Sequence, residues 1–205
     1  VHGISEMSFA GAALALLLGY DVVTGSMVGS IVSALLIGIL GVKKHDSNSV
    51  IGALMPFGLG LGILFLSLYQ GRSANKFSLL TGQIVSVDAD QLGNMIGGAI
   101  VIITILVLVW RPLSFASLDP EVAHAKGVPM RALSLVFMVV LGIAVALSVQ
   151  VVGSLLVLAL LITPAAAAMQ VTASPLRTLL LSVLFAEAAI VGGILLALAG
   201  SLPIS

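Results

Sequence analysis

Long apolar stretches separated by short polar segments run through this chain, and they constrain its fold more than any other feature. A helix needs about 20 apolar residues to cross the hydrocarbon core of a bilayer, because each residue advances it by about 1.5 Å. Only 8% of the 205 residues are charged, whereas roughly a quarter are charged in a soluble domain. So few charges cannot cover a surface that faces water. We therefore predict an all-α, polytopic transmembrane bundle.

About seven membrane-spanning helices account for these stretches. The apolar run 132–169 is too long for one span, and Ser148, Gln150 and Gly153 interrupt it, so we expect two short spans there. A further short helix, lying in or re-entering the membrane, is expected at 79–87. The other spans are expected at 2–20, 22–42, 50–69, 92–109 and 176–198. Residues 1–205 then form a single transmembrane domain, which we expect to be truncated at both ends.

The positive charges predict the orientation of these spans. On one side of the membrane, the connecting loops carry two Lys or Arg residues, and on the other side they carry six. Because loops rich in Lys and Arg stay in the cytoplasm, the second side is predicted to be cytoplasmic. The first set is Arg72 and Lys76, and the second is Lys43, Lys44, Arg111, Lys126, Arg131 and Arg177.

The longest polar interruption, residues 113–130, falls on the predicted cytoplasmic side. Asp119 is a good helix N-cap, Pro120 suits the first helical position, and Gly127 can end a helix. This pattern predicts a helix of about two turns held between two spans. We expect a second protein to act on this one through that helix.

Ionisable residues inside spans are functional candidates, because charges are costly in lipid. His2 and Glu6 are four residues apart, so one helix face presents both. Together they either contact a divalent cation or hydrogen-bond to each other. As metal ligands, two residues would leave the coordination shell of the ion incomplete. Glu187 either lines a pathway or, as we favour, accepts a bond from a neighbouring helix. Gln150 either satisfies backbone groups at the expected break or lines a pathway.

The chain lacks the sequence motifs of several enzyme classes. The chain has no cysteine, and its net charge of zero points to no nucleic acid. It contains no phosphate-binding P-loop, no Gly-x-Ser-x-Gly elbow and no His-Glu-x-x-His pair. We therefore expect no catalytic residues and no enzyme activity in this chain.

Four runs resemble one family: residues 5–11 (Ser-Glu-Met-Ser-Phe-Ala-Gly), 79–84 (Leu-Leu-Thr-Gly-Gln-Ile), 118–127 and 149–166. Together the runs resemble the permease subunit of bacterial ABC importers for zinc, manganese or iron. The resemblance implies a fold related to the vitamin B12-type importer permeases, in the bacterial cytoplasmic membrane. By comparison with the family, the first and last spans are absent here.

The resemblance also implies partners and sites. Two permease copies form a homodimer, two cytoplasmic ATPases drive it, and an extracytoplasmic binding protein delivers the metal. The metal is the substrate, and no cofactor is permanently bound. The family's metal contact is usually an Asp and a His four residues apart, and His2 and Glu6 match these positions in reversed order, with Glu in place of Asp. The ATPase-coupling residues correspond to Asp119, Pro120, Glu121, Ala123 and Gly127.

Other functions stay open. An ion-gradient carrier could use Glu187, although no inverted repeat is visible. A scaffold subunit without a pathway of its own would need neither His2 nor Glu6. Permeases for vitamin B12 and iron chelates belong to the same importer class but have more spans. Zinc, manganese and iron all accept imidazole and carboxylate ligands, so the ligand types do not rank them.

Overall fold

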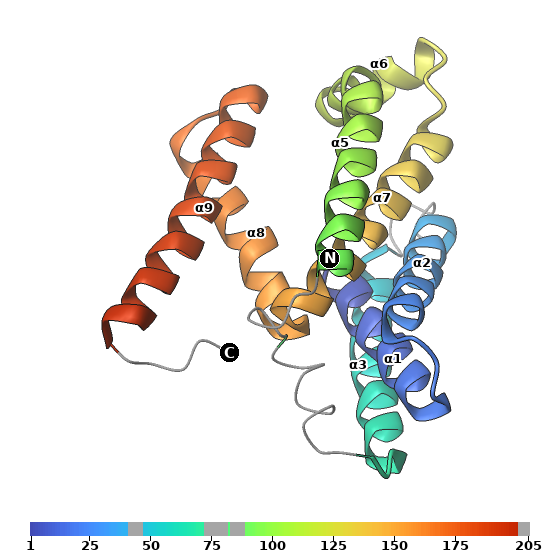
Figure 1. The fold of residues 1–205 in the computed structure, drawn as a ribbon. Helices are drawn as coiled ribbons and strands as arrows, with labels where there is room; N and C mark the ends of the chain where they lie inside the picture. The colour runs from blue at the N-terminus through green and yellow to red at the C-terminus, as the bar shows by residue number, and fades with distance from the viewer. Residues whose placement is uncertain (41–46, 72–81, 83–88, 201–205) are drawn as a thin grey trace.

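The computed structural model describes residues 1–40, 47–71, 82 and 89–200, and most of these residues are helical. Figure 1 shows their arrangement. The helix expected at 79–87 lies outside the described residues, except for Gly82. The helices are α1 (His2–Leu18), α2 (Val22–Leu40), α3 (Ser47–Leu68), α5 (Ala89–Leu118), α6 (Pro120–Ala125), α7 (Met130–Val152), α8 (Ser154–Val171) and α9 (Pro175–Gly200).

The predicted membrane bundle is confirmed in outline. Among the described residues, α2, α3, α5, α7 and α9 are long and apolar enough to cross a membrane, whereas α1 and the apolar part of α8 are shorter. The predicted break falls at Gly153, whose φ of 85° and ψ of 155° suit only glycine. The expectation of two short spans around it was half wrong, because α7 has full length and only α8 is short.

α5 differs most from its predicted span. It was expected to end at residue 109, but it continues through Pro112 to Leu118. A proline inside a helix costs one backbone hydrogen bond, and packing beyond the proline offsets this loss. Leu113, Phe115 and Ala116 join an apolar cluster with residues of α6 and α7. The polar interruption therefore begins at Asp119, six residues later than expected.

α1 makes most of its contacts with α2 and α3, and glycines allow these close contacts. A Cβ atom added at Gly29 of α2 would collide with the Met7 carbonyl oxygen, and one added at Gly58 of α3 would lie 2.9 Å from the Glu6 carbonyl carbon. Gly25 of α2 and Gly62 of α3 make similarly close contacts with Gly11 and Phe9 of α1. Such small residues let helix backbones approach closely in lipid.

Buried hydroxyl groups add polar contacts between the helices. The hydroxyls of Ser8 in α1 and Ser26 in α2 are 2.7 Å apart, and the Ser33 hydroxyl donates to the Gly3 carbonyl at 3.3 Å. Ser26 also donates to the Ala146 carbonyl in α7 at 3.5 Å. These bonds satisfy groups that have no access to water, and they fix α1 against its neighbours.

The close contact at Gly29 makes a testable prediction for stability. Gly29→Ala is expected to lower the free energy of unfolding by about 1–3 kcal/mol, because backbone atoms cannot move aside for the added methyl group. Gly52→Ala in α3 is the matched control, since a Cβ atom there meets nothing within 4 Å. Its greater helix propensity should leave stability equal or slightly higher. Equal unfolding midpoints in detergent for both variants would contradict the packing argument.

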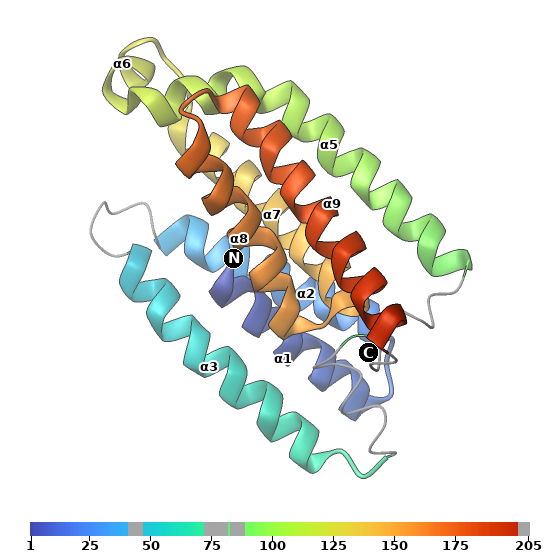
Figure 2. The ribbon, with the colours of Figure 1, turned by 90° about the vertical axis from the view of Figure 1, so that its left-hand side faces the viewer.

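α8 and α9 form a helical hairpin that stands beside the rest of the bundle (Figure 1). They pack mainly against each other, and Gly153 joins α8 to the end of α7. Figure 2 shows α3 along one side of the molecule and α5 along the opposite side, with α1 and α7 between them. The α5–α6–α7 corner projects at one end of the bundle in both views.

Candidate functional site

His2 and Glu6 lie one turn apart on α1. Glu6 is only 7% exposed and His2 is half-buried. Gly58 of α3 lies against the backbone of α1 at Glu6 and Met7, which holds this part of α1 close to α3. Both alternatives for the pair, contact with a divalent cation and a His2–Glu6 hydrogen bond, therefore stay predictions.

His2 and Glu6 alone would fill only part of the coordination shell of a metal ion. Within the described residues, no group of three or more His, Cys, Asp or Glu side chains is close enough to hold a metal ion. One imidazole and one carboxylate are chemically suited to zinc, manganese or ferrous iron. The remaining positions would have to come from water or from another chain. Such a pair can bind an ion briefly, which is what transport requires.

The fold brings the end of α7 next to this part of α1. Ile4, which lies between His2 and Glu6 in the sequence, shares an apolar cluster with Val149 of α7. Gln150 follows Val149, and its Nε2 atom is buried without a hydrogen-bond partner among the described residues. An unsatisfied buried amide is costly, and such a group calls for an explanation. Gln150 thus lies on a helix that packs against α1, and its predicted role stays a prediction.

Gly82 was not predicted to contact the α7–α8 break. It is buried with a φ of 77°, and a Cβ atom there would collide with the Val151 carbonyl oxygen. Gly82 belongs to the run 79–84 and Val151 to the run 149–166, and both runs contributed to the family resemblance, but nothing in the sequence indicated that these two residues meet. Only their separate match to the same family could have suggested a shared role.

Glu187 does not join the other candidates. It is exposed near the middle of α9, and α9 packs mainly on α8. Its predicted role, whether in a pathway or as a hydrogen-bond acceptor for a neighbouring helix, is not decided by this arrangement. A carboxyl group in that place needs water or another chain to cover it, because charged groups within spans rarely face lipid.

The predicted cytoplasmic helix is present as α6. The Asp119 side chain caps it by accepting the Val122 backbone N–H at 3.0 Å, and Pro120 occupies its first position. Gly127 follows with a φ of 80°, a conformation that favours glycine. Ala123 is completely buried against Ala116 of α5 and Leu133 of α7. The helix is thus fixed to the two spans that it connects.

The exposed side of α6 contains groups that sequence reasoning missed. Leu118 is 76% exposed and Val122 41% exposed, next to the exposed Glu121. The Lys126 ammonium lies 5.4 Å from the centre of the Phe115 ring, a cation–π contact that ties the end of α6 to α5. Leu118 is the last residue of α5 and Val122 lies in α6, with the non-helical Asp119 between them, so no helical spacing in the sequence indicated the pair.

Comparison with known proteins decides the family. A model described as the ABC 3 transport family matches residues 1–204. The chain belongs to the ABC 3 transport family. Its membership confirms the resemblance that the four sequence runs indicated, and with it the all-helical, multi-pass membrane fold. Like the relatives below, which are named as membrane or permease proteins, it is not an enzyme.

Two similar proteins carry names that concern manganese. The chain is 28% identical over 192 residues to the manganese transport system membrane protein MntC of Halalkalibacterium halodurans, covering 93% of this chain and 66% of that protein. It is 30% identical over 168 residues to the manganese import system permease protein ScaB of Streptococcus parasanguinis, covering 80% of this chain and 59% of that protein. The chain thus spans about three fifths to two thirds of their length.

A solved structure has the same fold. PsaBC from Streptococcus pneumoniae, determined in complex with a Fab, matches with a TM-score of 0.82 and 28% sequence identity. The match covers 98% of this chain and 72% of that one. The arrangement of helices described above is therefore similar to that of a chain in the PsaBC structure.

Proposed function

We propose that this chain is the membrane-spanning permease subunit of an ATP-driven importer for a divalent transition metal. The observation that carries the proposal is α6, a short capped helix outside the apolar spans that packs firmly on both α5 and α7. A rigid projection of this kind transmits displacement, whereas a loose loop absorbs it. The names of the relatives, which refer to manganese, favour Mn²⁺ over zinc and iron as the substrate.

The partners follow from this role. A cytoplasmic ATPase would contact the exposed surface of α6 and the adjoining end of α5, with Leu118 and Val122 as apolar contacts and Glu121 as a polar one. Movement of α6 would pass to α7, which packs against α1, the helix that carries the metal pair. An extracytoplasmic binding protein would deliver the ion on the opposite side of the membrane.

A second permease copy is part of the proposal. A charged residue at the centre of a membrane helix costs about 2.5–3.5 kcal/mol when it faces lipid, and Glu187 is exposed in the single subunit. Pairing of two copies around a water-filled path would relieve this cost. It would also supply ligands that the His2–Glu6 pair lacks. Both arguments favour a homodimer with the path at or near its interface.

Two substitutions at Gly127 test the coupling role. A Cβ atom at Gly127 meets nothing within 4 Å, so only its φ of 80° limits which residues fit. Gly127→Val is expected to reduce metal uptake and transport-coupled ATP hydrolysis roughly tenfold, because a β-branched residue disfavours this conformation, whereas asparagine tolerates it. Gly127→Asn is therefore expected to keep most activity. Full coupling in Gly127→Val, with normal membrane insertion, would count against the role of α6.

The metal and the energy source need a separate experiment. An uptake-deficient strain on chelated medium, expressing this protein with its ATPase and binding protein, should be rescued by manganese at lower concentrations than by zinc or iron. Rescue by zinc or iron first would change the proposed substrate. Uptake that stops with an uncoupler while cellular ATP stays high would instead favour an ion-gradient carrier.

A further inference from the structure

Gly82 lies against the backbone of the joint between α7 and α8. A Cβ atom at Gly82 would collide with the Val151 carbonyl oxygen and would lie 2.6 Å from the Gly153 nitrogen. Gly153 alone separates the two helices. Its N–H donates to the Val149 carbonyl at 2.8 Å, and its own carbonyl accepts the Val157 N–H at 3.2 Å. Because Gly153 is bonded in this way to both helices, a displacement of the joint moves the start of α8.

The start of α8 is in turn packed against α1. α8 contacts α1 as well as α7 and α9. Val157, in the first turn of α8, is 1% exposed and belongs to the same apolar cluster as Ile4 of α1. Ile4 lies between His2 and Glu6 in the sequence. Since closely packed interiors transmit displacement rather than absorb it, the joint is linked through α8 to the turn of α1 that carries the metal pair.

We propose that Gly82 is a positioning residue for the metal pair His2–Glu6. The lack of a side chain at position 82 fixes where α8 begins, and α8 fixes this part of α1. Gly82 acts through α8 and is not itself a ligand. The inference rests on the proposed function, because that function assigns metal contact to the pair.

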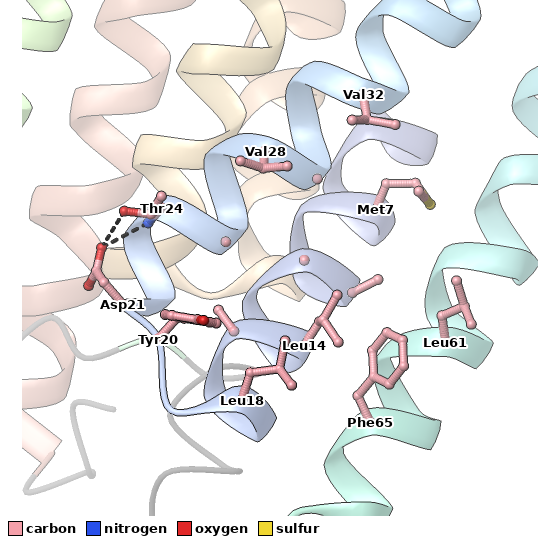
Figure 3. Close-up of a pocket in the computed structure, with 15 residues that line it drawn as sticks. Met7, Leu14, Leu18, Tyr20, Asp21, Thr24, Val28, Val32, Leu61 and Phe65 are labelled. Carbon is pink, nitrogen blue, oxygen red and sulfur yellow. Dashed lines mark hydrogen bonds between the residues drawn. The ribbon is translucent and has the colours of Figure 1, made fainter.

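Gly19 provides a matched control for the backbone conformation. Its φ is 76°, against 77° for Gly82, so alanine is strained equally at both positions. Gly19 lies between Leu18 and Tyr20, in the turn from α1 to α2 (Figure 3). A Cβ atom there meets nothing within 4 Å. Any difference between the two Ala variants therefore reports the collision with the α7–α8 joint.

Binding of Mn²⁺ to the protein assembled with its ATPase tests this inference. The loss of the electron paramagnetic resonance signal of free Mn²⁺ gives the Kd, and the variant with His2 and Glu6 both replaced by Ala gives the binding at other places. Gly82→Ala is expected to raise the Kd of the pair about tenfold, at the lower end of the 10–100-fold typical of residues that support a metal ligand. Gly19→Ala is expected to bind like the parent.

The Kd separates a positioning role from a merely structural one. A structural role would lower the amount of folded protein or its unfolding midpoint, but not the affinity of the molecules that fold. Equal Kd values in the two Ala variants would overturn the inference alone. If the parent binds no more Mn²⁺ than the double Ala variant, the metal contact in the proposed function fails, and the inference fails with it.

Val157→Ala tests the same link without a collision, and it decides the question if Gly82→Ala does not insert into the membrane. The substitution removes part of the contact between α8 and the cluster that contains Ile4. Val140→Ala is the control, because Val140 of α7 is also buried, at 4% exposure, but lies outside that cluster. Val157→Ala is expected to weaken Mn²⁺ binding several-fold and Val140→Ala to leave it unchanged. Equal binding in these two variants would overturn the inference.

Discussion

Metal uptake is expected to fall more than about 100-fold when His2 and Glu6 are both replaced by Ala. Loss of a residue that only supports a metal ligand typically costs 10–100-fold in affinity or activity, and this variant removes both protein ligands of the proposed site. The fold and the basal ATP hydrolysis of the assembly should survive, because the close contacts of Gly29 and Gly58 with α1 are made to backbone atoms of Met7 and Glu6, which the substitutions leave in place. Uptake of radioactive manganese into vesicles, with ATP inside, measures the effect.

The reversed pair is the matched control for this prediction. His2→Asp combined with Glu6→His keeps one imidazole and one carboxylate four residues apart, in the order usual for the family. Uptake in this variant is expected to stay within about tenfold of the parent, because the same ligand types occupy the same helix face. Unchanged uptake in the double Ala variant would reject metal contact at this pair and would favour a scaffold role.

The second large effect is expected in the coupling of ATP hydrolysis to metal uptake. Ala123→Leu is expected to reduce both metal uptake and the stimulation of ATP hydrolysis by the binding protein about tenfold or more. Ala123 has no exposed surface between Ala116 and Leu133, so the added atoms must push α6 away from α5 and α7. Such overpacking typically costs 1–3 kcal/mol, and about 1.4 kcal/mol corresponds to a factor of ten.

Ala132→Leu provides the control, because Ala132 is exposed in the first turn of α7 near the same corner. The same added volume there meets open space, so uptake and ATP hydrolysis should stay normal. If Ala123→Leu inserts into the membrane and transports like the parent protein, the firm seating of α6 is not what transmits movement. In that case the exposed residues Leu118 and Val122 would become the next candidates.

Several features were predicted from the sequence because they depend on residues close together in the chain. The lengths of the apolar runs predicted the spans, since the transfer of a helix into lipid depends on its own side chains. Asp119, Pro120 and Gly127 predicted α6 and its ends, because capping and a positive φ are local properties. Gly153 predicted the break between α7 and α8 for the same reason.

The prediction failed where packing outweighed a local signal. The fourth predicted span was expected to end at residue 109, but Leu113 and Phe115 continue α5 beyond Pro112 because they pack against α6 and α7. In the same way, Leu118 and Val122 received no role, because exposure is a property of the folded surface. A single proline costs less than the contacts that the continued helix gains.

The sequence by itself thus determined that this protein crosses the membrane repeatedly, where most of its spans lie, and which ionisable residues lie within the predicted spans. Tertiary structure alone decided that Gly82 lies on the α7–α8 break, that α1 packs closely against both α2 and α3, and that α9 packs mainly on α8. The physical reason is the range of the interactions. Helix formation and transfer into lipid depend on neighbouring residues, whereas these contacts join residues far apart in the chain and depend on how whole helices fit together.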